Sequence, residues 1–340
     1  MNLVKYLIAL FIFTFSFILT FATFTFPSRA EDSEHIMRSS FATTFQIDFE
    51  GIKEVYIYRP QTFRFVTRVI YQKPDFVYTE YLEPDQLKGK IIIDDGKRRI
   101  EYLSVEDRTR ILPSFNHPQM ETLREMALKV VLSNFKISFL SREEMLGREV
   151  YVFELSPKNT ISPSLKLWID KETYLTLQRE TYGPGGEPVF FFRYIEVEFN
   201  KEFSREKLYE KIPQTAQIKK EPPLVSYFTE KEITEKLKFP VCFPTYLPPG
   251  YVFQAGELTE EKRDVKLIYT NGLEVIVLFQ RPRVNIMMRH HRWVRTDKMR
   301  IRYVTGPYGS TLVWDGEDKT FVLMGDVPVE ELIKVAQSVE

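Results

Sequence analysis

The sequence predicts an α+β protein made of two antiparallel β domains in series. Three observations support this prediction. Hydrophobic residues alternate with period two through most of residues 40–215, and a single stretch with helix spacing interrupts them. A charged segment that contains two prolines, at residues 216–238, then separates this region from a second β-rich unit.

The N-terminal segment, residues 1–30, has the layout of a secretory signal peptide. Lys5 precedes an apolar run from Leu7 to Phe26, and Ser28 and Ala30 place small residues before a plausible cleavage site. At roughly 20 residues, the apolar run could instead remain attached as a membrane anchor. In both cases we expect the rest of the chain to be exported, to the periplasm or another extracytoplasmic space.

The large domain, predicted at residues 31–215, is a long antiparallel meander. In FRFVTRVIY, Phe63 and Phe65 lie on one side of a strand and Arg64 on the other. The stretch IIIDDGKRRIEYL predicts a hairpin across Asp95-Gly96. In QMETLREMALKVVLSNF the apolar residues recur at helix spacing, so we expect this helix to lie with its apolar stripe against the sheet.

The small domain is predicted at residues 239–340, after a linker at residues 216–238 that ends in a short helix. VKLIYTNGLEVIVLF predicts a hairpin with Asn271-Gly272 at its tip, because this dipeptide is among the strongest hairpin signals. A final amphipathic helix begins near Pro328.

The sequence contains no local motif for catalysis, a cofactor or a metal. No glycine-rich phosphate loop and no G-x-S-x-G elbow is present, although a Ser-His-Asp triad scattered along the chain would leave no local motif. The adjacent His290 and His291 would diverge on a strand, and the arginines beside them would repel a cation. We therefore expect a protein that is not an enzyme and that has no metal and no cofactor.

Charge and cysteine content exclude further classes of protein. Without Lys5 and Arg29 of the N-terminal segment, 45 of the 47 basic residues remain against 47 acidic residues, so the chain lacks the overall positive charge of a nucleic-acid-binding protein. Cys242 is the only cysteine, which rules out an intramolecular disulfide.

One local region is strongly basic. From Arg281 to Arg302 there are eight Lys or Arg residues and only Asp297 of opposite sign. Such a run is often only a solvated surface. The functional alternative is docking of an anionic partner, which could be an acidic protein segment, phospholipid head groups or lipopolysaccharide phosphates. The candidate docking residues are Arg281, Arg283, Arg289, Arg292, Trp293 and Arg295.

Motifs in both halves resemble one known family. The stretches LPPGYVF, VKLIYTNGLEVIVLFQ and MGDVPVEELIKVAQSVE resemble the C-terminal domain of the MucB/RseB family, periplasmic regulators of an envelope-stress sigma factor. The stretches YQKPD, LGREVYVFELSP and LKLWIDKETYLTLQRETYG are similar to the large domain of that family and to the outer-membrane lipoprotein carrier LolA. A looser group of exported Gram-positive proteins, with a LolA-like domain and a similar C-terminal module, fits the same motifs.

The resemblance implies that the large domain is a strongly curved antiparallel half-barrel sheet, covered by helices, with an apolar concave side that can hold acyl chains. It brings no catalytic residues. The candidates for this lining are aromatic residues of the predicted strands, namely Phe63, Phe65, Trp168, Phe190, Phe192 and Tyr194. The alternative is that these residues form an ordinary hydrophobic core.

The function implied by the resemblance is regulatory. The large domain would bind lipid or lipoprotein, and the small domain would dock a membrane-anchored anti-sigma factor or another acidic protein segment. The alternatives are a LolA-like carrier for lipoproteins or lipids, and a structural envelope protein whose cavity is filled by its own side chains.

Overall fold

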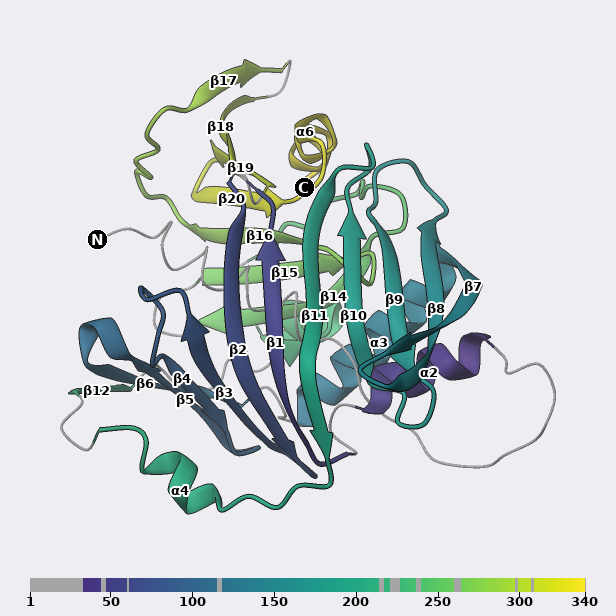
Figure 1. Ribbon diagram of the computed structural model, residues 1–340. Helices are drawn as coiled ribbons and strands as arrows, with labels where there is room; N and C mark the ends of the chain where they lie inside the picture. The colour runs from purple at the N-terminus through teal and green to yellow at the C-terminus, as the bar shows by residue number, and fades with distance from the viewer. Residues whose placement is uncertain are drawn as a thin grey trace.

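The computed structural model describes residues 33–340, except for 44–46, 60, 115–117, 214–216, 221–226, 237–239, 260–263, 297–298, 307–308 and 340. The described residues form two sheets, of 12 and 8 strands, that follow each other along the chain (Figure 1). The predicted signal peptide or anchor, residues 1–30, lies outside them. No helix within the described ranges is both long enough and apolar enough to cross a membrane.

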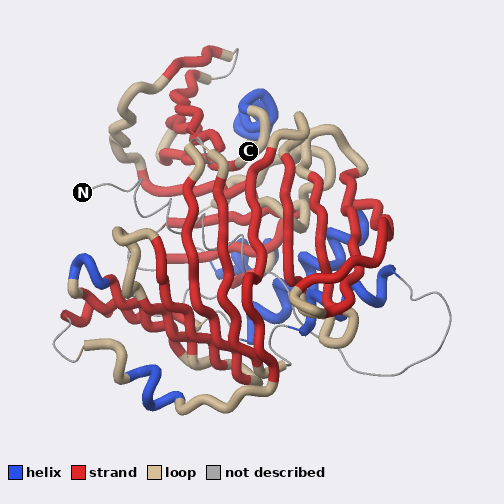
Figure 2. The backbone as a smooth tube through the Cα atoms, viewed as in Figure 1, coloured by secondary structure: helices blue, strands red, loops and turns tan. Residues whose placement is uncertain are grey.

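The large sheet is antiparallel except at one edge. In spatial order its strands are β12 (Gln217–Lys220), β6 (Arg108–Pro113), β5 (Arg98–Leu103), β4 (Ile91–Asp94), β3 (Phe76–Glu83), β2 (Phe63–Gln72), β1 (Phe49–Ile57), β11 (Pro188–Phe199), β10 (Thr176–Tyr182), β9 (Ser164–Asp170), β8 (Arg148–Pro157) and β7 (Phe135–Met145). The end strands β12 and β7 do not pair with each other, so the sheet stays open. The predicted fold class, a curved open sheet with helices followed by a smaller α+β domain, is confirmed (Figure 2).

Two helices cover one face of this sheet. Helix α2 (Ser33–Thr43) and helix α3 (Pro118–Asn134) pack on β7 to β9, where Met37 and Val131 join Phe153 and Leu167 in one buried cluster. This confirms that the apolar stripe predicted in QMETLREMALKVVLSNF lies against the sheet. A short helix, α4 (Arg205–Tyr209), packs against β3 to β5 through Leu208 (Figure 1).

The small sheet packs on the C-terminal helix. Its strands, in order, are β13 (Tyr227–Phe228), β14 (Val252–Thr259), β15 (Asp264–Thr270), β16 (Val275–Pro282), β20 (Lys319–Gly325), β19 (Gly309–Asp315), β18 (Arg300–Gly306) and β17 (Arg292–Arg295). Helix α6 (Val329–Gln337) buries Leu332 and Val335 against Leu278 and Leu323. The Asn271-Gly272 hairpin between β15 and β16 is present as predicted.

The segment predicted as a linker, residues 216–238, is partly built into both sheets. β12 adds to β6 in parallel, and β13 pairs with β14. The predicted short helix is α5 (Glu230–Lys236), and its Ile233 packs into the core of the small domain. Residues 221–226, in the middle of this segment, lie outside the described residues. Sequence alternation could not show the two added strands, because each is very short.

The tip of the Asn271-Gly272 hairpin is buried where the two domains meet. Asn271 is 0% exposed, and its Nδ2 donates a hydrogen bond to Ser162 Oγ of the large domain at 3.1 Å. From the end of α3, Asn134 Nδ2 donates to Asn271 O at 3.0 Å and to Gly250 O at 2.7 Å. Gly272, with φ of +98°, lies directly against Val131 of α3. A turn that the sequence marks only as a hairpin is thus a docking element between the domains.

A buried acidic residue lies beside this tip. The Glu274 carboxyl accepts hydrogen bonds from Tyr251 Oη at 3.2 Å and from Asn271 Nδ2 at 3.1 Å. Burial, together with the nearby Asp326 carboxyl, raises the pKa of Glu274 to about 8. Asp326 in turn lies 3.6 Å from the Arg59 guanidinium of the large domain. The domain junction therefore contains a buried carboxyl group whose pKa is raised well above its ordinary value.

Candidate ligand-binding wall and partner-docking arm

Strand register gathers most of the predicted lining residues on one face of the large sheet. Phe190 on β11 lies opposite Ile57 of β1, which lies opposite Phe63 of β2. Two residues before Ile57 on β1, Val55 lies opposite Phe192 of β11 and opposite Phe65 of β2. Because side chains alternate along a strand, these residues share a face, which we call the aromatic wall. The predicted common face of Phe190, Phe192 and Tyr194 is confirmed, since Tyr194 lies opposite Lys53, two residues before Val55.

The rings of the aromatic wall touch one another and remain partly open to solvent. The centroids of Phe63 and Phe65 are 6.0 Å apart, and those of Phe190 and Phe192 are 6.1 Å apart. Phe63 is 43% exposed, whereas Phe65, Phe190 and Phe192 are half-buried. Ring faces that are close to one another and incompletely covered can accept an apolar ligand.

Basic side chains border the wall, and the sequence analysis missed them. Lys53 Nζ lies 5.1 Å from the centroid of Phe192 and 5.8 Å from that of Tyr194. Burial among these rings lowers the pKa of Lys53 to about 8. The Arg179 guanidinium lies 5.7 Å from the Phe190 ring, and burial lowers the pKa of Arg179 to about 10. In the strand FEGIKEVYI, side-chain alternation puts Lys53 on the same face as Phe49, Val55 and Ile57. This alternation could have predicted that Lys53 borders the aromatic residues.

Two of the predicted lining residues are core residues. Trp168 is 6% exposed, packs with Val150 and Val152, and donates from Nε1 to Glu143 at 2.8 Å. Tyr194 is 5% exposed, and its ring fills the space that a Cβ on Gly51 would occupy. Both side chains are therefore packed in the core, which is the alternative that the sequence left open for the aromatic candidates.

A shallow pocket of about 280 Å³ is found near the same strands. It is lined by Met145, Leu146, Gln178, Arg193, Tyr194 and Ile195. Of the predicted lining residues only Tyr194 borders it, so this pocket is separate from the open rings of the aromatic wall.

The predicted docking residues lie in the small domain, mostly on a projecting arm. We call residues 283–306 the β17–β18 arm; they form the loop after β16 and the strands β17 and β18 (Figure 1). Arg283, Arg289, Arg292 and Arg295 are exposed on this arm. Arg281 differs, because it lies within β16 and forms an ion pair with Asp264 at 3.3 Å.

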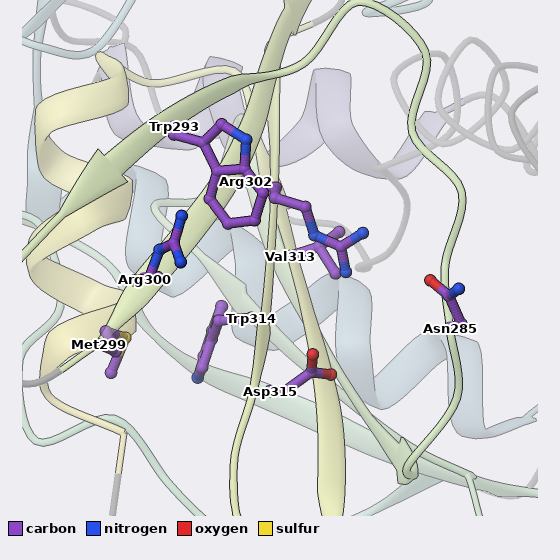
Figure 3. A pocket seen from close by; sticks show the side chains of 8 residues that line it. All are labelled: Asn285, Trp293, Met299, Arg300, Arg302, Val313, Trp314 and Asp315. Carbon is purple, nitrogen blue, oxygen red and sulfur yellow. The ribbon is translucent and has the colours of Figure 1, made fainter.

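Trp293 lies at the centre of the arm, among arginines. The guanidinium of Arg300 is 4.7 Å from its ring centroid, and that of Arg302 is 6.0 Å away. A pocket of about 500 Å³ opens here, lined by Asn285, Trp293, Met299, Arg300, Arg302, Val313, Trp314 and Asp315 (Figure 3). Arg300 and Arg302 were not among the predicted docking residues, because only the pairing of β17 with β18 brings them beside Trp293.

The histidine pair of the arm makes local contacts. His291 Nδ1 lies 2.8 Å from Met288 O, and its ring meets Trp293 edge-on at 5.4 Å. His290 adopts a left-handed backbone, with φ of +56°. In the part of the chain that the structure describes, no group of three or more His, Cys, Asp or Glu could hold a metal ion.

Family models match each domain. Residues 99–212 match the MucB/RseB N-terminal domain, and residues 242–339 match a domain of unknown function, DUF4367. The second match differs from the predicted RseB-type C-terminal domain. An uncharacterized protein, MJ0687 of Methanocaldococcus jannaschii, is 21% identical over 273 residues, which cover 76% of this chain and 77% of that protein.

Solved structures show the same fold over both domains. MucB in complex with MucA(peri) aligns over 91% of this chain and 98% of that chain, with a TM-score of 0.59 and 13% identity. The Pseudomonas aeruginosa MucA/MucB complex gives the same coverage and identity, with a TM-score of 0.60. The chain is therefore similar to the MucB/RseB N-terminal domain over residues 99–212, and its two domains together have the fold of MucB.

Proposed function

We propose that the protein is a non-enzymatic, exported regulator that binds a lipid or lipoprotein in its large domain and a membrane-anchored anti-sigma factor, or a similar protein, through its small domain. The observation that carries the proposal is the fold shared with MucB over both domains, since the two solved MucB structures described above are complexes with MucA. The half-open aromatic wall and the basic β17–β18 arm supply the two kinds of surface that such a regulator needs.

Lipid binding is assigned to the aromatic wall. Partly exposed rings can cover acyl chains, and each buried CH₂ contributes about 0.8 kcal/mol. Lys53 places an ammonium group beside Phe192, where it can meet the anionic head of an amphiphile. Because the wall and the arm lie in different domains, a ligand at one can influence the other only through the domain junction.

We expect Phe192→Ala to weaken binding of a fluorescent fatty-acyl probe about tenfold, since one ring contact contributes roughly 1.5 kcal/mol. The matched control is Phe191→Ala, because Phe191 is also half-buried but packs against Tyr56 on the opposite face. Fluorescence titration of both variants measures the effect. Equal affinities for the two variants would remove the wall from the proposal.

Partner docking is assigned to the β17–β18 arm. We expect the triple variant R289E/R292E/R295E to lose most of its partner, about tenfold or more in recovered complex, because like charges then face an acidic segment. The measurement is cross-linking in cells, followed by quantitative mass spectrometry of a co-purifying single-span protein.

The matched control reverses three exposed cations of the large domain, Lys129, Lys136 and Lys207. Net charge changes equally in the two triple variants, so a general electrostatic effect would lower recovery in both. Unchanged recovery with the arm variant would contradict docking at the arm.

The aromatic wall also supports a second candidate, a carrier that moves lipoproteins or lipids between membranes. Transfer of a labelled lipoprotein from donor to acceptor vesicles discriminates between the two candidates. A carrier transfers its cargo without any partner, whereas a regulator holds the ligand and changes its affinity for the partner.

A further inference from the structure

Strand β17 is an edge strand with one side unpaired. It is the last strand of the small sheet, and among the described strands it pairs only with β18. The hairpin is closed by Thr296 N–H, which donates to Met299 O at 2.9 Å. Backbone groups alternate in direction along an antiparallel strand, so the N–H groups of Trp293 and Arg295 point away from β18. These two residues therefore offer backbone hydrogen bonds to an added strand.

The exposed face of this edge is cationic. The register sets Trp293 opposite Arg302 and Arg295 opposite Arg300, so all four side chains share one face. Arg302 donates from Nη1 to Ile286 O at 2.8 Å, and neither Arg295 nor Arg300 forms an ion pair with a carboxylate of the described residues. The register makes Arg295, Arg300 and Arg302 neighbours, so their guanidinium groups repel one another, and acidic side chains on an added strand would relieve that repulsion.

The opposite face of β17 is apolar at its centre. Val294 packs on the core of the small domain with Ile301 and Tyr303. An added strand would thus need carboxylates on one face and apolar or β-branched side chains on the other. Trp293 is 53% exposed, and the 500 Å³ pocket beside it has room for a larger apolar side chain at the edge (Figure 3).

The chemistry of the edge selects a protein segment over other anions. Lipid head groups can pair with guanidinium groups but make no use of a row of backbone N–H and C=O groups. A second copy of β17 would bring its own arginines against these arginines, which disfavours self-pairing. An acidic extended segment satisfies both the backbone groups and the charges.

We propose that the outer edge of β17 binds an extended acidic segment of a protein partner by strand addition, with its carboxylates paired to Arg295, Arg300 and Arg302 and one apolar side chain packed on Trp293. This deepens the proposed function, on which it rests for the existence of a protein partner. It adds the conformation of the bound segment, its alternating pattern and the residues that recognise it.

The test compares two substitutions at one residue. Arg295→Ala removes a charged side chain, whereas Arg295→Pro also removes the outward N–H and leaves the hydrogen bonds to β18 in place. The probe is a fluorescent peptide of alternating glutamate and threonine with a central leucine. We expect R295A to weaken its binding about threefold and R295P to weaken it about tenfold more, measured by fluorescence anisotropy with the full chain.

A second measurement leaves the protein unchanged. The same peptide, N-methylated at alternate amides, keeps its charges but loses the donors that a strand ladder uses, so we expect about tenfold weaker binding to the wild-type chain. Equal binding of R295A and R295P, with equal binding of the methylated and plain peptides, would overturn strand addition.

Two further outcomes separate this inference from the proposed function. Vesicles of anionic phospholipid that bind wild type and R295P equally and displace the peptide would overturn the peptide site in favour of a membrane surface. A cellular partner complex that tolerates R295P would also overturn it, while leaving the regulator proposal intact. If the fatty-acyl probe does not bind the aromatic wall, this contradicts the proposed regulator function and leaves strand addition at β17 unaffected.

Discussion

Gly272→Ala is expected to lower the free energy of unfolding by roughly 2–5 kcal/mol and to separate the two domains in part. Gly272 has φ of +98°, where a side chain costs about 1–2 kcal/mol. A Cβ built there would lie 2.6 Å from Val131 Cγ2 and 2.7 Å from Val131 N of helix α3. Because the second contact is with backbone, it cannot be relieved by a rotamer change, and overpacking adds about 1–3 kcal/mol.

The matched control for this variant is Gly186→Ala. Gly186 has φ of +81°, and nothing lies within 4 Å of the position its Cβ would take. Urea unfolding should give about 1 kcal/mol for G186A, which reports backbone strain alone. Small-angle X-ray scattering should show a larger radius of gyration only for G272A. Equal losses of stability for the two variants would mean that the hairpin tip does not hold the domains together.

Glu274 is expected to make the stability of the protein decrease as pH rises towards 8. Burial raises the pKa of Glu274 from its ordinary value of 4.5 to about 8, so the folded chain retains a proton that the unfolded chain releases. The stabilisation is complete below the unfolded pKa, and it is lost as pH rises through the folded pKa. For a shift of this size the loss is up to about 4 kcal/mol between pH 5 and pH 8.

The comparison of wild type with Glu274→Gln isolates this effect. Glutamine keeps a similar shape and an amide in place of the protonated carboxyl, so the variant should show little of the slope and be the more stable protein at pH 8. Around the carboxyl, Asp326 raises its pKa, whereas Asn271, Tyr251 and Arg59 lower it. Urea unfolding at several pH values provides the measurement. A slope that persists in E274Q would assign the titration to another group, with Asp326 first, because burial also raises the pKa of Asp326.

The sequence predicted the strands well, because a sheet with one buried face imposes period-two alternation on each strand. The shared face of Phe190 and Phe192 followed from this rule and is confirmed by the pairing of β11 with β1. The rule could not separate open rings from core rings. Trp168 and Phe192 look alike in sequence, yet Trp168 is buried against Val152 whereas Phe192 is half-buried. That difference depends on segments packed from elsewhere in the chain.

Contacts between residues that are far apart in the chain could not be predicted from the sequence either. Asn271 was predictable as a turn residue, but its burial depends on Asn134, which lies 137 residues earlier. The basic run from Arg281 to Arg302 was evident, whereas the pairing of Arg281 with Asp264 and the edge position of β17 are properties of strand order. Strand order is set by how hairpins pack together, which local alternation does not encode.

The connection between the sheets limits how far the two domains can move apart. β12 is fixed to the large sheet at Lys220 and β13 to the small sheet at Tyr227, so seven peptide steps join them. A fully extended tether of that length reaches about 25 Å. If the hairpin tip separates from α3, the small domain therefore remains near the large domain, at an effective concentration in the millimolar range or above. Undocking should consequently be brief and reversible.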